Sequence, residues 1–195
     1  MRILVLGAGG AIAREFIPLA QSDHDLRLFV RGKCKLGAHD ERAFIGDADD
    51  ISALTVAMAG VDLAVSTLGP RGVDRLAVNV LRAMDDTGVK RLVFVSSAGI
   101  YDEVPGALGA QIRALGAYID EQRRACDLIE QSSVDYTILR PMYLTDGEET
   151  IYRTFQKGEQ IIGGEISRKA VARAIRDIVF ENLFRRQSIG LANAI

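Results

Sequence analysis

Residues 3–13 read ILVLGAGGAIA, an apolar run followed by a glycine-rich turn and the start of a pattern with helical period. The order predicts a strand, a sharp turn at Gly7 and a helix. Backbone at Gly9 and Gly10 is free to approach a pyrophosphate that a side chain would obstruct, and the first N–H groups of the helix point at the same place. We therefore expect a dinucleotide at this turn, against Gly7, Gly9, Gly10, Ala11 and Ile12.

A glycine turn between a strand and a helix is also a purely structural feature of many α/β proteins. Here the turn follows the first strand of the chain, where a doubly wound sheet places its phosphate loop. The third small residue of the motif is Ala13, and alanine, like glycine, allows a helix to pack closely on a strand. The position of the turn favours the binding interpretation.

Composition and charge narrow the class of protein. A chain of 195 residues, 48% hydrophobic and 26% charged, fits one soluble domain over residues 1–195. The net charge of −2 gives no reason to bind nucleic acid or an anionic membrane. Two cysteines (Cys34, Cys126) and two histidines (His24, His39) indicate neither a disulfide framework nor a metal site. Without a signal-peptide pattern, we expect a cytoplasmic monomer or homodimer.

Short apolar runs alternate with longer segments of helical period along the whole chain. This alternation is typical of an α/β fold: a doubly wound parallel sheet between two layers of helices, the Rossmann fold. Residues 143–166 fit neither period, and we expect loops with short strands that form a small C-terminal cap. The expected strands are 2–6, 26–30, 43–46, 61–66, 91–96 and 134–139, and the expected helices are 11–21, 50–59, 73–87, 110–131 and 167–182.

The end of the second expected strand bears on the choice of dinucleotide. A carboxylate there, ~20 residues after the glycine turn, would accept hydrogen bonds from the 2′-OH of NAD. The sequence has Arg31 instead. A guanidinium suits a 2′-phosphate because it carries a permanent charge and paired donors, although Arg31 could also be an ordinary solvated loop residue. We expect NADP rather than NAD.

Two further strand ends supply candidate contacts. Asp47, followed by Ala48, ends the third strand, where its carboxylate would accept from the adenine amino group, cap the following helix, or do both. The fourth strand ends in the small turn Thr67-Leu68-Gly69, which would let a cofactor lie close or would simply reverse the chain. We expect these residues to border the dinucleotide.

Several segments occur in an order known from one family. They are the loop Gly7–Ala13, Val30-Arg31, Gly46-Asp47, the run VFVSSA at 93–98, the run VDYTILRP at 134–141, and Ile166-Ser167-Arg168 before a helix. This order resembles the NAD(P)-binding atypical short-chain dehydrogenases, including NmrA-like and flavin or biliverdin reductase-like members. The resemblance covers nearly the whole chain. It implies the fold more strongly than the reaction, because the family includes reductases, epimerases and non-catalytic sensors.

In catalytic members of that family a serine orients the substrate, and a tyrosine four residues before a lysine exchanges the proton. The resemblance places Ser97 and Tyr118 at the serine and tyrosine positions. It places Gln122 where the lysine would bind the nicotinamide ribose. It also puts three residues beside the cofactor: Ser96, Pro141 and Met142.

Gln122 also stands out by periodicity, because it is the polar member of an inward stripe on the expected helix 110–131. A buried, unpaired amide costs ~1–3 kcal/mol, so a cofactor ribose or water at the helix edge would have to supply partners. Glutamine carries no charge that could stabilise a phenolate, which disfavours alcohol oxidation through Tyr118. Tyr101 is expected near the mouth of the site, either lining a substrate pocket or covering the end of the sheet.

These features favour an NADPH-dependent reductase that passes hydride to a planar small molecule such as a flavin. Such an acceptor takes its proton from water and needs no protein base. A non-catalytic NADP-binding redox sensor is the alternative from another class. A relative of nucleotide-sugar epimerases or dehydratases is disfavoured by Gln122 and by the short chain.

Overall fold

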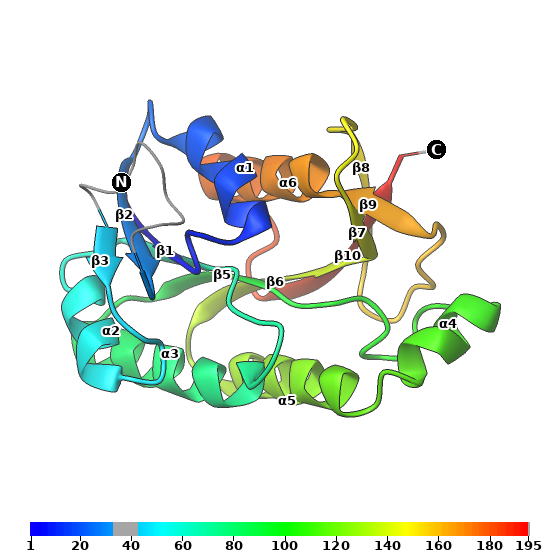
Figure 1. The fold of residues 1–195 in the computed structure, drawn as a ribbon, viewed down its shortest axis with the longest axis horizontal. Helices are drawn as coiled ribbons and strands as arrows, with labels where there is room; N and C mark the ends of the chain where they lie inside the picture. Colours follow the sequence, from blue (N-terminus) through cyan, green and yellow to red (C-terminus); the bar gives the residue numbers. More distant parts are fainter. Residues whose placement is uncertain (33–42, 195) are drawn as a thin grey trace.

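The computed structural model describes residues 1–32 and 43–194 as a mostly parallel sheet between two layers of helices (Figure 1). Cys34 and His39 lie outside the described residues. The strands are β1 Arg2–Leu6, β2 Asp25–Val30, β3 Ala43–Ile45, β4 Leu63–Ser66, β5 Arg91–Val95, β6 Asp135–Pro141, β7 Tyr143–Thr145, β8 Tyr152–Phe155, β9 Glu165–Ser167 and β10 Gln187–Asn193. The helices are α1 Ala11–Ala20, α2 Ile51–Met58, α3 Val73–Thr87, α4 Gly106–Arg113, α5 Ala117–Gln131 and α6 Arg168–Glu181. The expected doubly wound α/β fold is confirmed.

The eight-stranded main sheet has the order β3-β2-β1-β4-β5-β6-β10-β8. Strand β1 lies between β2 and β4, so that Leu6 pairs with both Phe29 and Ser66. From β1 the chain winds first towards β3 and then back across towards β8. The order of the strands therefore reverses at β1, and in such sheets the crevice at the carboxyl ends of the strands beside this point is where ligands bind.

Each face of the sheet has its own core. Along β1, Ile3 and Val5 pack with α1 and α6, whereas Leu4 and Leu6 pack with α2, α3 and α5. Figure 1 shows these two groups of helices on opposite sides of the sheet. Alternate side chains of a strand point to opposite faces, so a central parallel strand is apolar throughout and shows no polar alternation.

The expected helix 110–131 is wrong as a single element. The structure has α4 and α5 separated by a break at Gly116, whose φ is 52° and ψ is −117°. Glycine adopts this conformation without steric cost, while the apolar stripe continued across the break and concealed it. Tyr118 consequently lies in the first turn of α5.

The last strand, β10, was not expected from the sequence. Its centre is Gly190, where an added Cβ would come within 2.5 Å of the Ile161 side chain. Glycine weakens the local signal for a strand. Pairing with β6 on one side and β8 on the other defines β10.

The expected cap contains short strands, as the sequence indicated, but they divide between two sheets. Strands β7 and β9 pair with each other, whereas β8 joins the edge of the main sheet. In the part of the chain that the structure describes, the helices are too short and too polar to cross a membrane.

Candidate functional site

A cavity of about 640 Å³ opens beside the carboxyl ends of β1, β2, β3 and β4. It brings together many of the residues that the sequence singled out, from four separate segments: Gly7, Gly9, Gly10, Arg31, Asp47, Ala48, Thr67, Leu68 and Gly69. It also contains residues that the sequence analysis missed: Phe29, Val30, Gly32, Asp49, Arg71, Arg75 and Leu76. The volume is in the range of small-molecule and cofactor sites.

The glycine turn has the backbone conformation that its sequence suggested. Gly7 has a φ of +77°, and Gly10 N–H donates to the Gly7 carbonyl at 2.8 Å. A Cβ on Gly7 would lie 3.0 Å from Thr67 Oγ1, a hydroxyl that itself donates to the Leu6 carbonyl. The turn is therefore held against the end of β4 with no space for a side chain.

Helix α1 starts directly behind this turn. Its N-cap residue, Gly10, provides no side-chain hydrogen bond to the first turn. The N–H groups at a helix start are left without partners inside the helix, and with the helix dipole they favour an anion. Ala11 and Ile12 belong to this first turn but do not line the cavity, and the Ile12 side chain is buried in the core.

Among the described residues, three arginines line the cavity. Arg31 follows β2 as expected, while Arg71 and Arg75 come from the loop after β4 and the first turn of α3. Arg75 pairs with Asp49 across the cavity wall at 2.9 Å. The sequence signal that could have found these arginines is their position, since they follow the turn after the fourth strand and lie four residues apart.

The role of Asp47 as a helix cap is excluded by its neighbour. Asp50 is the N-cap residue of α2, and its carboxylate accepts from Ser52 N–H and Ala53 N–H. Asp47 lines the cavity and accepts from Asp49 N–H at 3.1 Å. Its place in the cavity lining leaves the adenine interpretation a prediction.

The structure gives Gln122 a partner that the sequence did not suggest. Its Oε1 accepts from Ser96 Oγ at 2.9 Å, and Cys126 Sγ lies 3.2 Å from the same hydroxyl. Gln122 is only 3% exposed, so the alternative of a side chain reaching water at the helix edge is wrong. Neither Ser96 nor Gln122 lines the cavity.

Burial raises the pKa of the Cys126 thiol to about 12. We expect Cys126 in the folded protein to react with iodoacetamide about a hundredfold or more slowly than an unperturbed thiol at pH 8, because the thiolate is the nucleophile and Cys126 is 0% exposed. Mass spectrometry of a Cys34→Ser variant measures this rate at Cys126 alone. Equal labelling of native and denatured protein at pH 8 would contradict the prediction.

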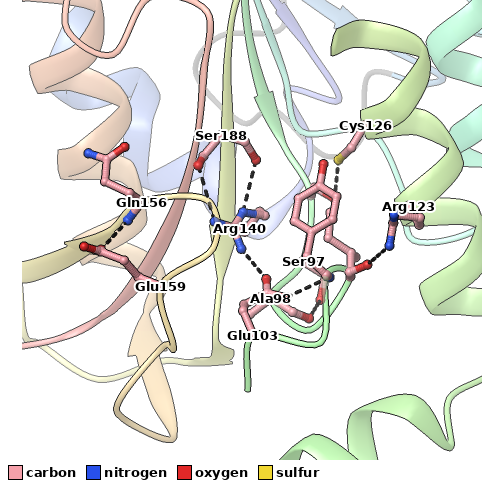
Figure 2. A network of polar contacts seen from close by, with 12 residues as sticks. Ser97, Ala98, Glu103, Arg123, Cys126, Arg140, Gln156, Glu159 and Ser188 are labelled. Carbon is pink, nitrogen blue, oxygen red and sulfur yellow. Dashed lines mark hydrogen bonds and ion pairs between the residues drawn. The ribbon is translucent and has the colours of Figure 1, made fainter. Parts of the chain in front are cut away.

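The remaining predicted residues lie at the ends of β5 and β6, except for Tyr118, which lies in the first turn of α5. Ser97 Oγ donates to the carbonyl of Ala98 (Figure 2). Ala98 N–H donates to the Pro141 carbonyl at 2.9 Å. Met142 is buried, and Tyr118 is partly buried against the core that contains α2, α3 and α5. None of these four residues lines the cavity: Ser97, Tyr118, Pro141 and Met142.

Tyr101 does not line the cavity, and charged side chains surround its ring. Its hydroxyl donates to Glu130, and the cations of Lys157, Arg123 and Arg140 approach its ring to between 4.2 and 5.2 Å. Burial, and then the nearby Cys126 and Glu130, raise the pKa of Tyr101 well above its ordinary value. Tyr101 is therefore unsuited to act as an acid or base near neutral pH.

A buried ion pair joins the loop after β5 to the sheet. Arg140 contacts Glu103 directly, and their side chains are 0% and 2% exposed. Figure 2 shows Arg140 between Glu103 and Ser188, whose hydroxyl accepts from Arg140 Nε at 3.1 Å. The Glu103 carboxylate also accepts from Tyr101 N–H, and its carbonyl accepts from Ile161 N–H of the cap. The loop that carries Ser97 is thus tied to β6, β10 and the cap.

A glycine turn, an uncapped helix start and a cationic cavity at the reversal of strand order define a Rossmann-fold nucleotide-binding protein. A family model described as NAD(P)H-binding matches residues 7–182, and the chain belongs to this family. No curated protein sequence matches the chain. Within residues 1–32 and 43–194, His, Cys, Asp and Glu form no group that could hold a metal ion.

Solved structures are similar over nearly the whole chain. A Rossmann-fold NAD(P)-binding family protein from Shigella flexneri is 33% identical, with a TM-score of 0.85 over 98% of this chain and 93% of that one. A short-chain dehydrogenase/reductase from Veillonella parvula, in complex with NADP, is 26% identical, with a TM-score of 0.89 over 98% and 94%. ChuY, an anaerobillin reductase from Escherichia coli O157:H7, is 24% identical over 99% and 97%, with a TM-score of 0.85, and supports the fold alone. The resemblance seen in the sequence is confirmed.

Proposed function

We propose that the protein is an NADPH-dependent oxidoreductase that transfers hydride to a planar acceptor such as a flavin, without a Tyr–Lys dyad. The observation that carries the proposal is the cavity, in which the glycine turn meets Arg31, Arg71 and Arg75. Backbone N–H groups suit the pyrophosphate, and guanidinium groups suit a 2′-phosphate. The NADP complex of the Veillonella parvula relative, at 26% identity, supports the same cofactor here.

The environment beyond the cavity supports an acceptor that needs no protein base. Gln122, which the family resemblance places at the lysine position, carries no charge and accepts a hydrogen bond from Ser96. Tyr101 is held by Glu130 with a raised pKa. When bound, NADPH supplies the hydride, and the protein's own part is to bind and orient the two molecules. A flavin or a linear tetrapyrrole then takes its proton from water.

The proposed reaction is tested by following the loss of NADPH absorbance at fixed protein concentration with FMN, or another planar acceptor, added. Turnover is expected, and Tyr118→Phe should retain at least about half of it, since general acid–base catalysis would otherwise lose 10²–10⁴-fold. Loss of turnover in Tyr118→Phe would contradict the proposal that the reaction does not use Tyr118 as a proton donor. Ser97→Ala, tested alongside, measures the orienting role that the family resemblance gives to Ser97.

Arg31 is expected to select NADPH over NADH. Arg31→Asp should weaken NADPH binding by about 30-fold or more, because a bidentate phosphate contact is lost and a like charge is introduced. Binding of NADH should change less than about threefold, since that cofactor lacks the 2′-phosphate. Calorimetric titration with each cofactor measures both values. Arg153→Asp, on edge strand β8 at the far side of the sheet, is the control. Equal losses for the two cofactors would remove the reason to choose NADP.

A second candidate function is a redox sensor that binds NADP without turnover. The bond between Gln122 and Ser96 favours it, because a buried, uncharged pair in place of a lysine leaves no group to activate a substrate. Tight NADPH binding with no turnover on a panel of flavins and linear tetrapyrroles would decide for the sensor. A nucleotide-sugar epimerase or dehydratase would instead require a general base that these residues do not supply.

A further inference from the structure

Helix α3 begins beside the cavity without a cap of its own. Its N-cap residue is Gly72, with a φ of 66° and no side chain to accept hydrogen bonds. In a capping box, the residue three positions later is a Glu or Gln that reaches back to the N-cap N–H. That position here is Arg75, which faces the cavity and pairs with Asp49 instead.

The missing acceptor comes from a different helix. Glu121 of α5 accepts from Gly72 N–H through Oε2 at 2.7 Å, across 49 positions of sequence. One turn further along α5, Arg124 Nε lies 2.8 Å from Asp74 Oδ2. Both ties reach the start of α3, so α5 fixes the point at which the loop after β4 becomes a helix.

This fixed point is next to cavity-lining residues on both sides. Arg71 immediately precedes Gly72, and Arg75 follows within the first turn of α3. The left-handed conformation of Gly72 sets the direction of the chain on either side of it. A change in the Gly72 backbone dihedrals would therefore move Arg71, the residue directly before it. Glu121 itself does not line the cavity.

We propose that Glu121 is a positioning residue for dinucleotide binding: by accepting the Gly72 N–H it holds Arg71 where its guanidinium binds a phosphate of NADPH. The inference rests on the proposed function, because it takes NADPH as the occupant of the cavity. It adds a residue outside the cavity, on a different helix, that the glycine motif does not contain.

The test compares three substitutions in the full-length protein by calorimetric titration with NADPH. Glu121→Leu removes the acceptor and should weaken binding about fivefold, whereas Glu121→Gln keeps an acceptor oxygen and should bind within about twofold of wild type. Asp120→Leu, an exposed residue on the same helix, controls for the loss of a negative charge and should bind like wild type. Without ligand, Glu121→Leu should melt no more than about 6 °C below wild type and remain folded at the titration temperature.

A double-substitution cycle tests whether Glu121 acts through Arg71. Arg71→Ala should weaken NADPH binding about tenfold, and adding Glu121→Leu should weaken it little further, because residues that act as a unit are not additive. Losses that multiply, or Glu121→Gln binding as weakly as Glu121→Leu, would overturn the positioning role. So would wild-type affinity in Glu121→Leu. If the wild-type protein does not bind NADPH at all, the proposed function fails together with this inference. The wild-type titration alone distinguishes that result from a failure of the positioning role.

Discussion

Glu103→Gln is expected to lower the free energy of unfolding by about 3–5 kcal/mol, because it leaves the charge of Arg140 buried without a counter-charge. Arg140 is 0% exposed, and Ser188 accepts its other hydrogen bonds. For a chain of this size the loss corresponds to a melting temperature lower by on the order of 10 °C. Calorimetry or circular dichroism during heating measures it.

The control is an ion pair in solvent. Asp146 pairs with Arg168 at 2.7 Å but is 91% exposed, and Asp146→Asn should cost less than about 1 kcal/mol. A double variant, Glu103→Leu with Arg140→Met, should recover much of the stability that either single substitution loses, since apolar groups in place of a buried pair are often tolerated. If Glu103→Gln left the melting temperature unchanged, the prediction that buried Arg140 needs the Glu103 carboxylate for stability would be wrong.

The consequence for the site concerns the loop after β5. Glu103 holds Tyr101 N–H through its side chain and Ile161 N–H through its carbonyl. Loss of the pair should therefore loosen the loop that carries Ser97 and the cap in the same variant. Hydrogen exchange that quickens first at residues 97–103 and 156–161 would show the two segments opening together.

Gly7→Val is expected to weaken NADPH binding by about 100-fold or more, the equivalent of losing two charge-assisted hydrogen bonds to phosphate. The φ of +77° disfavours any residue with a side chain, and the new Cβ would meet Thr67 at 3.0 Å. A displaced turn no longer presents its N–H groups to the pyrophosphate. Titration with NADPH measures the loss, and a melting curve without ligand measures the separate cost to the fold.

Gly32→Ala is the matched control at the same cavity. Among residues 1–32 and 43–194, a Cβ at Gly32 would meet nothing within 4 Å, so this substitution should leave the fold intact and change NADPH affinity by less than about threefold. If Gly7→Val bound NADPH as tightly as Gly32→Ala, the glycine turn would not be the phosphate site. That result would remove the basis of the enzyme and sensor proposals alike.

Some residues of the candidate site could be predicted from the sequence, and others could not, because their positions depend on segments that are distant in the chain. Gly7, Gly9 and Gly10 were evident from the sequence because a sharp turn and a close approach constrain the backbone locally. Arg31 was evident for a similar reason, since the end of a parallel strand meets the cleft. Arg71 and Arg75 were missed because their place in the cavity depends on the direction in which α3 leaves the loop, which Gly72 and Glu121 set.

The sequence by itself determined the alternation of strands and helices, the opening glycine turn and the apolar stripes, all of which arise from periodicity and from constraints within a few residues. Only the tertiary structure decided that Gln122 bonds Ser96, that Arg140 is neutralised by Glu103, and that β10 enters the sheet between β6 and β8. These contacts join residues distant in the chain. A buried polar group takes whichever partner the packing of several elements brings within reach, and no local pattern of the sequence records that choice.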